Sequence, residues 1–220
     1  MTSPAPARTL RDRKRERTRR ALIDAAADLF ERRGYDRTTV ADIAAAADIG
    51  TRTFFSYFAS KEELLFPESD ARVKAAEAAI AARRPGDQPA DVLLRALHEV
   101  GEASDEMTGR HAALRTRLVQ TVPAVRGRAL QIQLDAQRDI ARRLHEAFPD
   151  ELDDISAAAL VGAFVGAVSG ALTALFDDPA TSLDDPGQLR DRLRRATDIA
   201  LRPWRRLAPA QRQRGPGLSR

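Results

Sequence analysis

The chain of 220 residues contains no cysteine and only three histidines. Without cysteine there is no disulfide framework and no thiol chemistry. His98 begins a near-motif, H-E-V-G-E, but glutamate stands where the helix of a zinc metallopeptidase carries its second histidine. We therefore expect no metal site, and we interpret the three histidines as surface or hydrogen-bonded core residues.

Other signatures of catalysis are also missing. No serine lies in a nucleophile elbow, and no glycine-rich loop follows a strand. We therefore predict that the chain is not an enzyme and uses no cofactor.

Strand-like alternation of apolar and polar residues is almost absent, whereas helical periodicity runs through most of the chain. The sequence therefore predicts an all-α fold. Arginine precedes any apolar run at the N-terminus and no signal-peptide core follows, so we expect a cytoplasmic protein.

The charge is distributed unevenly. The net charge is +4, but residues 8–20 hold eight basic and two acidic side chains, and residues 202–220 hold six basic and no acidic ones. The rest of the chain therefore carries −8. A basic N-terminal arm on an acidic body is the pattern expected when one end contacts phosphates. A merely solvated charge run is the alternative.

Residues 35–64 are the most informative segment, because they predict two short helices joined by a tight turn. Thr39 and Asp42 form a capping box that opens the first helix. Asp48 suits a left-handed residue in the turn, and Gly50 suits the N-cap of a second helix that begins near Thr51.

Phe54 and Phe58 lie four residues apart, so they are expected to pack on one face of that second helix and leave a short polar face outward. Ser60 and Glu63 form a second capping box. It predicts a further helix whose free amides, with Lys61 beside them, face a phosphate.

Residues 17–65 resemble the N-terminal domain of the TetR family of bacterial transcriptional repressors. The resemblance rests on the following pairs and runs: Thr38-Thr39, Ile43-Ala44, Asp48-Ile49, Phe54-Phe55, Tyr57-Phe58 and Lys61-Glu62-Glu63-Leu64. Two positions depart from the usual pattern, since Asp48 replaces a glycine and Gly50 replaces a serine-like cap. Gly50 offers no side chain for a contact with the DNA backbone.

The resemblance implies a set of DNA contacts. Thr39, Tyr57 and Lys61 are the implied phosphate contacts. The candidates at base edges are Thr51, Arg52 and Phe55, and we add Thr53 and Ser56 on the same short helix. Phe55 suits a thymine methyl group, although closing the core of the domain is its alternative role.

The expected organisation has four parts. Residues 1–12 form a disordered arm, 13–65 the helix-turn-helix DNA-binding domain, 66–208 a larger helical ligand-binding and dimerisation domain, and 209–220 a disordered basic tail. The first helix is expected over 13–33. The remaining helices are expected at 61–82 with an interruption at Pro67, 89–107, 111–120, 123–147, 152–176 and 187–207.

Residues 155–176 carry no charged side chain, and this run is long enough to span a membrane. We reject a membrane span because the run is rich in alanine and glycine and is flanked by acidic residues. A helix that is apolar all round is otherwise buried on all sides. Gly162, Gly166 and Gly170 lie on one stripe, where a helix from a second copy can approach closely, and packing inside one copy is the alternative.

These observations predict a homodimeric regulator that binds a palindromic operator in double-stranded DNA. It is expected to be a repressor that a small apolar or acyl-type effector releases from this operator. The residues expected to line the effector site are His98, Arg115, Arg117, Gln131 and Phe164. The alternative is a structural DNA-binding protein with no ligand switch.

Overall fold

The computed structural model describes residues 9–67, 69–103, 110–178, 181 and 185–203. Within these ranges the chain forms only helices, which confirms the all-α prediction. The elements are α1 (Leu10–Arg33), α2 (Val40–Ala46), α3 (Thr51–Phe54), the 3-10 helix η1 (Glu62–Leu65), α4 (Ser69–Ala81), α5 (Pro89–Ala103), α6 (Arg110–Thr121), α7 (Pro123–Ala147), α8 (Asp154–Asp177) and α9 (Pro186–Leu201).

The described residues form two compact units. The first contains the residues up to Pro67 together with Arg117–Ala129, and the second contains those between Glu68 and Thr116 and from Leu130 onward. The division after Pro67 lies close to the predicted boundary. The assignment of residues 117–129 to the first unit was not predicted, because it depends on contacts between segments distant in sequence.

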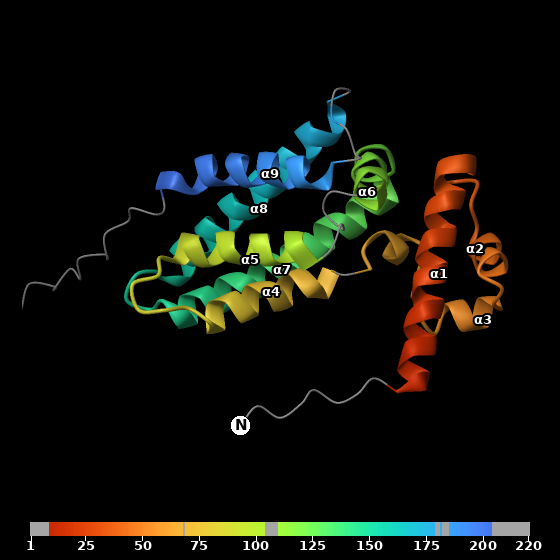
Figure 1. Ribbon diagram of the computed structural model, residues 1–220, viewed down its shortest axis with the longest axis horizontal. Coiled ribbons are helices and arrows are strands. Elements are labelled where there is room, and N and C mark those ends of the chain that lie inside the picture. The colour runs from red at the N-terminus through yellow and green to blue at the C-terminus, as the bar shows by residue number, and fades with distance from the viewer. Residues whose placement is uncertain (1–8, 68, 104–109, 179–180, 182–184, 204–220) are drawn as a thin grey trace, which may run out of the picture. The chain divides into compact units, whose positions relative to one another are not determined.

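In the first unit, α2 and α3 lie beside α1 (Figure 1). The core of this unit consists of apolar side chains from α1 and from the segments that follow it: Leu22, Ala26, Leu29, Phe30, Tyr35, Ile43, Ala44, Phe54, Phe58, Leu64 and Leu65. This core holds the two short helices against one long helix, so their opposite faces are free for another role.

α1 begins at Leu10, three residues before the expected start, because Thr9 and Asp12 form a capping box. It ends at Gly34, which has φ 85° and ψ 157° and whose N–H donates to the Phe30 carbonyl at 3.0 Å. That backbone conformation is almost exclusive to glycine, so Gly34 fixes where the chain leaves the helix.

The second unit is a helical body in which α4 packs on α5 and α8 on α9. Its main core includes Leu93, Leu144, Leu160, Val161 and Leu201, each no more than 1% exposed. A smaller cluster joins Leu175 of α8 to α9.

Two helices in the middle of the chain closely match their predicted ranges. The helix expected at 111–120 is α6, which extends one residue further at each end, and the helix expected at 123–147 is α7, which has the same bounds. α7 starts at Pro123, a favourable first helical residue, so its N-terminus is fixed locally.

One helix-start prediction was wrong. Ser60 and Glu63 do not form a capping box: η1 starts after Lys61 with no side-chain cap, and α4 begins only at Ser69. The Glu63 carboxylate instead accepts a hydrogen bond from the Ala59 N–H at 2.8 Å. A hydrogen bond four residues back competes with the capping geometry, so no long helix starts at Ser60. Pro67 does interrupt the segment as predicted.

The C-terminal predictions are resolved only in part. α9 ends at Leu201, two residues before Pro203, which agrees with a helix that stops at this proline. The segment 204–207 of the predicted helix, the tail at 209–220 and residues 1–8 of the predicted arm lie outside the described residues.

In a single copy of the chain the apolar helix α8 is not buried on all sides, and burial of its remaining surface by a second copy stays a prediction. Only Ala157, Leu160, Val161 and Leu175 are buried on α8, and 17% of its most apolar window is covered. By length and composition α8 is able to cross a membrane, but one such helix is weak evidence for a membrane protein. A large apolar surface of this kind usually marks an interaction site.

Candidate nucleic-acid interface

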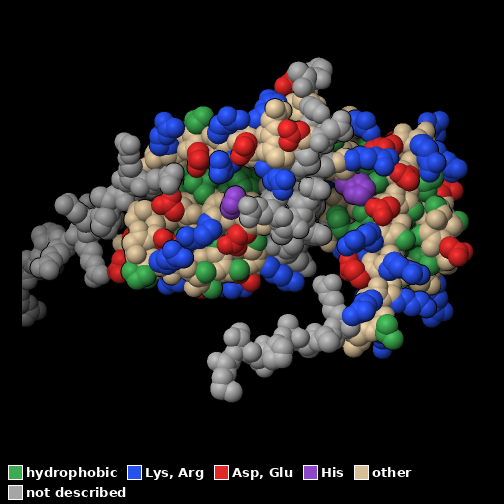
Figure 2. Space-filling view, viewed as in Figure 1, with side chains coloured by type: hydrophobic (Ala, Val, Ile, Leu, Met, Phe, Trp, Pro, Cys, Tyr) green, Lys and Arg blue, Asp and Glu red, His purple; other side chains and the backbone are tan. Residues whose placement is uncertain are grey.

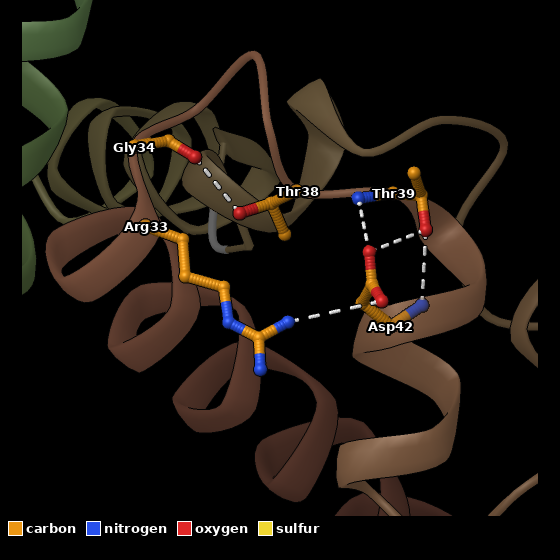
Figure 3. Close-up of polar contacts among 5 residues, drawn as sticks. All are labelled: Arg33, Gly34, Thr38, Thr39 and Asp42. Atoms are coloured by element: carbon orange, nitrogen blue, oxygen red, sulfur yellow. Dashed lines mark hydrogen bonds and ion pairs between the residues drawn. The ribbon is translucent and has the colours of Figure 1, made fainter.

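The start of α2 is held by a closed set of hydrogen bonds between Thr39 and Asp42 (Figure 3). The Thr39 N–H and hydroxyl donate to Asp42 Oδ2 at 2.9 and 2.6 Å, and the Asp42 N–H donates to the Thr39 hydroxyl at 3.1 Å. These bonds, with Arg33 Nη1 at 3.9 Å, lower the pKa of Asp42. The predicted capping box is confirmed, and Thr39 is exposed at the helix N-terminus, where anions bind favourably.

Thr38, next to it, has a different role. Its side chain is fully buried and its hydroxyl donates to the Gly34 carbonyl at 2.8 Å (Figure 3). The two adjacent threonines therefore separate into one that ties α2 to the end of α1 and one that stays at the surface.

The turn between α2 and α3 has the predicted geometry. Asp48 is the one non-glycine residue with positive φ among those described, at 55°. Short polar side chains tolerate this left-handed conformation best, which explains why the turn forms without the usual glycine. Gly50 is the N-cap of α3 and, as expected, makes no side-chain cap bond.

α3 presents one apolar and one polar face. Phe54 is 0% exposed and Phe58 4%, so these rings anchor the helix in the core, whereas Phe55 is 57% exposed. Its ring packs edge-on against Phe54 with 5.3 Å between centroids. The structure therefore rules out the alternative role of Phe55 in closing the core.

The outward face of this segment is formed by exposed residues, and it includes every base-edge candidate: Thr51, Arg52, Thr53, Phe55 and Ser56. Ser56 donates its hydroxyl to the Thr53 carbonyl at 2.6 Å, which leaves oxygen lone pairs as acceptors toward solvent. The face combines one cation, one aromatic ring and three hydroxyls, a set able to make hydrogen bonds and apolar contacts to base edges.

Lys61 is more constrained than a freely solvated lysine. Its Nζ donates to the carbonyls of Tyr35 and Thr38, each at 3.1 Å, and lies 4.0 Å from the centroid of the Tyr35 ring. An ammonium group has three donors, so these bonds leave one N–H for a phosphate. The backbone carbonyls orient the charge, and η1 contributes no capped helix to this position.

Tyr35 and Glu62 form a hydrogen-bonded pair beside Lys61. The Tyr35 hydroxyl donates to Glu62 Oε1, and burial followed by this bond raises the pKa of Tyr35. Burial alone acts to raise the pKa of Glu62, but hydrogen bonds from Ser60 and Tyr35 outweigh it and lower that pKa. The pair therefore carries a stable negative charge beside the ammonium group of Lys61.

Tyr57, the remaining phosphate candidate, is half-buried, and the guanidinium of Arg15 lies 5.5 Å from its ring centroid. Arg19 takes the equivalent position over Phe58 at 5.2 Å. The sequence analysis did not single out either arginine. Their signal was the spacing of Arg15, Arg19 and Leu22, which places both arginines in line with the buried stripe of α1.

The structure does not bring the five effector candidates together at one site. His98, Arg117 and Gln131 are exposed on α5, α6 and α7, whereas Arg115 is 8% exposed and Phe164 packs against the main core of the second unit. Arg117 belongs to the first unit and the others do not. No group of histidine and acidic side chains suited to a metal occurs in the described part of the chain.

The three glycines of α8 lie on its uncovered side. A Cβ atom added to Gly162, Gly166 or Gly170 meets nothing within 4 Å inside one copy of the chain. At 100° per residue, Leu175 lies about half a turn around the helix from Gly166, so the stripe is opposite a buried residue. The alternative that the glycines pack inside one copy is therefore wrong.

Comparison with known proteins finds a family model and a relative that are both bacterial regulators. Residues 22–66 match the model of bacterial regulatory proteins of the tetR family. The chain is 37% identical over 150 residues to the HTH-type transcriptional regulator TcmR of Streptomyces glaucescens. That match spans 66% of this chain and 66% of TcmR, slightly less than two thirds of each.

Two solved structures share the fold at low identity. Thermus thermophilus FadR, a TetR-family transcriptional repressor in complex with lauroyl-CoA, has a TM-score of 0.52 at 20% identity, over 90% of this chain and 99% of FadR. SmeT of Stenotrophomonas maltophilia, in complex with triclosan, has a TM-score of 0.57 at 18% identity, over 89% of this chain and 96% of SmeT.

Proposed function

We propose that this chain is a DNA-binding transcriptional regulator of the TetR family, as its similarity to that family supports, and that it acts as a homodimeric repressor with a ligand switch. It is not an enzyme. The observation that carries the proposal is the exposed face of α3, held outward by the buried rings of Phe54 and Phe58. We place its action in the cytoplasm, on a near-palindromic operator in double-stranded DNA.

In the proposed complex, one α3 per subunit enters the major groove. Arg52 donates to a guanine and Phe55 contacts a thymine methyl, while Thr51, Thr53 and Ser56 reach base edges or adjacent phosphates. Thr39, Tyr57 and Lys61 hold the backbone and set the register. Two such subunits bind half-sites separated by about 34 to 36 Å or a multiple of it.

Replacing Arg52 by alanine is expected to cost about 1 to 3 kcal/mol of binding free energy on the operator and to relax specificity at one base pair. Binding to random DNA should change little, because the exposed guanidinium is proposed to read a base edge. Selection of sites from a random duplex library, followed by titration of wild type and variant, measures both effects.

Lys61→Ala is the contrasting variant. It should weaken binding to operator and random DNA alike and lower the salt dependence, since Lys61 is proposed to contact a phosphate. An equal decrease in affinity for both DNAs in the Arg52→Ala variant would show that Arg52 contacts a phosphate and not a base edge.

We propose that the effector is a largely apolar molecule with a polar or anionic end. The apolar helices of the body and the arginine candidates support this class, and the relatives agree with it: FadR is in complex with lauroyl-CoA and SmeT with triclosan. His98, Arg115, Gln131 and Phe164, which all belong to the second unit, remain the proposed lining, and Arg117, which belongs to the first unit, is left out of it. Arg115 is the candidate for the anionic end, since it is the buried cation among these residues.

The start of α7 offers a route from the body to the DNA-binding residues. Arg128 Nη2 lies 3.0 Å from Glu63 Oε1, and Glu63 Oε2 accepts from the N–H of Ala59, which follows Phe58. α7 begins in the first unit and continues into the second. A ligand that shifts α7 would therefore act on the segment directly after α3, and a tenfold change in DNA affinity needs only about 1.4 kcal/mol of coupling.

Reciprocity provides the test of the ligand switch. Operator DNA must weaken effector binding by the same factor by which the effector weakens DNA binding. Calorimetry of lauroyl-CoA with the wild-type protein, alone and with its selected DNA site, should show this decrease. Identical affinities in both titrations would exclude lauroyl-CoA as an effector, and failure of a broad apolar library would favour a structural DNA-binding protein with no ligand switch.

A further inference from the structure

Both hydrogen-bond donors of Thr39 are occupied within the protein. Its N–H and its hydroxyl donate to the same carboxylate oxygen, Asp42 Oδ2, at 2.9 and 2.6 Å. A threonine hydroxyl carries a single hydrogen, and a DNA phosphate offers only acceptor oxygens. In this conformation Thr39 therefore has no hydrogen left to donate to a phosphate, although the residue is exposed.

The Asp42 carboxylate takes the place that a phosphate oxygen would need. The Asp42 N–H also donates to the Thr39 hydroxyl at 3.1 Å, which closes the set of bonds. The hydrogen bonds from the Thr39 hydroxyl and N–H, and then the Arg33 guanidinium, lower the pKa of Asp42, so the carboxylate is charged at neutral pH. An anion that already holds these donors repels a second anion.

Arg33 offers the carboxylate a second position. Figure 3 shows Asp42 between Thr39 and the Arg33 guanidinium, whose Nη1 lies 3.9 Å from Asp42 Oδ1. A charge-assisted hydrogen bond of this kind is about 2.7 to 2.9 Å long, so the ion pair has about 1 Å left to close. Among the described residues the guanidinium has no other hydrogen bond or ion pair. A rotation of the Asp42 side chain toward Arg33 would release Thr39 and keep the carboxylate paired.

We propose that Asp42 is a positioning residue for DNA binding, whose carboxylate holds the donors of Thr39 in the free protein and moves to Arg33 when a DNA phosphate takes them. This inference rests on the proposed function, in which Thr39 contacts a phosphate. The exchange leaves every group paired, because the phosphate receives the Thr39 N–H and hydroxyl while Asp42 receives the guanidinium. Binding at Thr39 then depends on Arg33, although Arg33 does not touch the DNA.

Asp42→Asn removes the charge and keeps an oxygen that accepts the Thr39 N–H. The variant should bind operator and random DNA alike more tightly, by about two- to fivefold for each subunit, the range of one exposed charge–charge interaction. Its unfolding temperature should be equal or lower, because a neutral side chain is a weaker partner in the capping box. A residue that only supports the start of α2 would change stability and DNA affinity in the same direction.

Asp36→Asn is the matched control for the loss of one negative charge. Acidic and basic side chains lie close together over much of the surface in view (Figure 2), so any such loss strengthens the attraction to DNA slightly. Asp36 is exposed and lies three residues before Thr39, and its substitution changes the net charge equally. The gain beyond this control is the measured quantity. Asp42→Glu keeps the charge and the capping box and should restore the wild-type affinity.

Arg33→Gln tests the second position of the carboxylate. In the wild-type background it should weaken binding to both DNAs by about two- to fivefold, because the released carboxylate has lost its partner. In the Asp42→Asn background the same substitution should have a much smaller effect. A direct contact of Arg33 with a phosphate would instead give equal losses in both backgrounds. Arg32→Gln, at the neighbouring exposed arginine, is the control for the loss of one positive charge.

The variants are compared by circular dichroism and by titration of the DNA site that wild type selects and of a random duplex. Equal affinities of the Asp42→Asn and Asp36→Asn variants, or weaker binding by Asp42→Asn, would overturn the inference while DNA binding by wild type still stands. If Asp42→Asn does not fold, Arg33→Gln decides: a greater loss than in Arg32→Gln supports the inference, and an equal loss overturns it. Failure of wild type to select any site would contradict the proposed function instead.

Discussion

Gly166→Leu is expected to yield a folded chain that no longer forms dimers. Inside one copy the position is open, since a Cβ there meets nothing within 4 Å, and leucine favours a helix by up to about 1 kcal/mol over glycine. In a closely packed pair of helices, the added side chain collides with the partner helix, and such overpacking typically destabilises the pair by about 1 to 3 kcal/mol for each site. A symmetric interface contains the substitution twice, so the dissociation constant of the dimer should rise by about tenfold or more.

Sedimentation of wild type and variant measures this change, and Gly127→Leu is the matched control. Gly127 is also an exposed helical glycine with open space at its Cβ, but it lies on α7 rather than on the α8 stripe. Operator affinity should fall with dimerisation, because both half-sites must be held at once. An unchanged dimer in the Gly166 variant would place the interface elsewhere, and a wild-type monomer would remove the dimer from the proposal.

Phe54→Ala should unfold the DNA-binding unit at moderate temperature, while Phe55→Ala should leave its stability intact. Phe54 is fully buried, and removing a buried phenylalanine side chain typically costs about 3 to 5 kcal/mol. This is a large fraction of the stability of an ordinary domain. Phe55 is 57% exposed, so its removal should change the free energy of unfolding by only about 0.5 kcal/mol.

The two substitutions should also differ in which DNA they affect. Phe55→Ala should weaken operator binding but leave random DNA almost unaffected, since its ring is proposed to contact a base. Phe54→Ala should reduce binding to both. Thermal unfolding followed by circular dichroism, together with titration of both DNAs, gives the comparison. Equal destabilisation by the two substitutions would show that Phe55 also supports the core.

The helix starts and the tight turn were predictable from sequence because their causes are local. The Thr39 and Asp42 capping box connects residues three apart, and Asp48 adopts its left-handed conformation through its own short polar side chain. Pro123 opens α7 for the same kind of reason, since its fixed φ suits a first helical residue. Each of these features depends on one turn of chain.

The partners of Glu63 and Lys61 are set by tertiary contacts. The local pattern predicts that Glu63 is a capping residue, but Arg128, 65 residues further on, and the N–H of Ala59 bind its carboxylate. The same pattern predicts Lys61 beside free helix amides that face a phosphate, but carbonyls 26 and 23 residues earlier hold its ammonium group. No local pattern predicts such partners, because a charged side chain binds whichever acceptor the fold brings within reach.

The helical class, the helix-turn-helix segment, the family resemblance and the uneven charge all follow from the amino-acid sequence, since periodicity, capping and composition act within a few turns. Tertiary packing was needed to establish that Phe55 is exposed instead of closing the core, that Arg15 and Arg19 stack on the rings of Tyr57 and Phe58, and that the glycine stripe of α8 faces outward. Those outcomes depend on which face of each helix meets another. A one-dimensional pattern does not contain that choice when both faces are apolar, as on α8, or both neighbours are aromatic, as on α3.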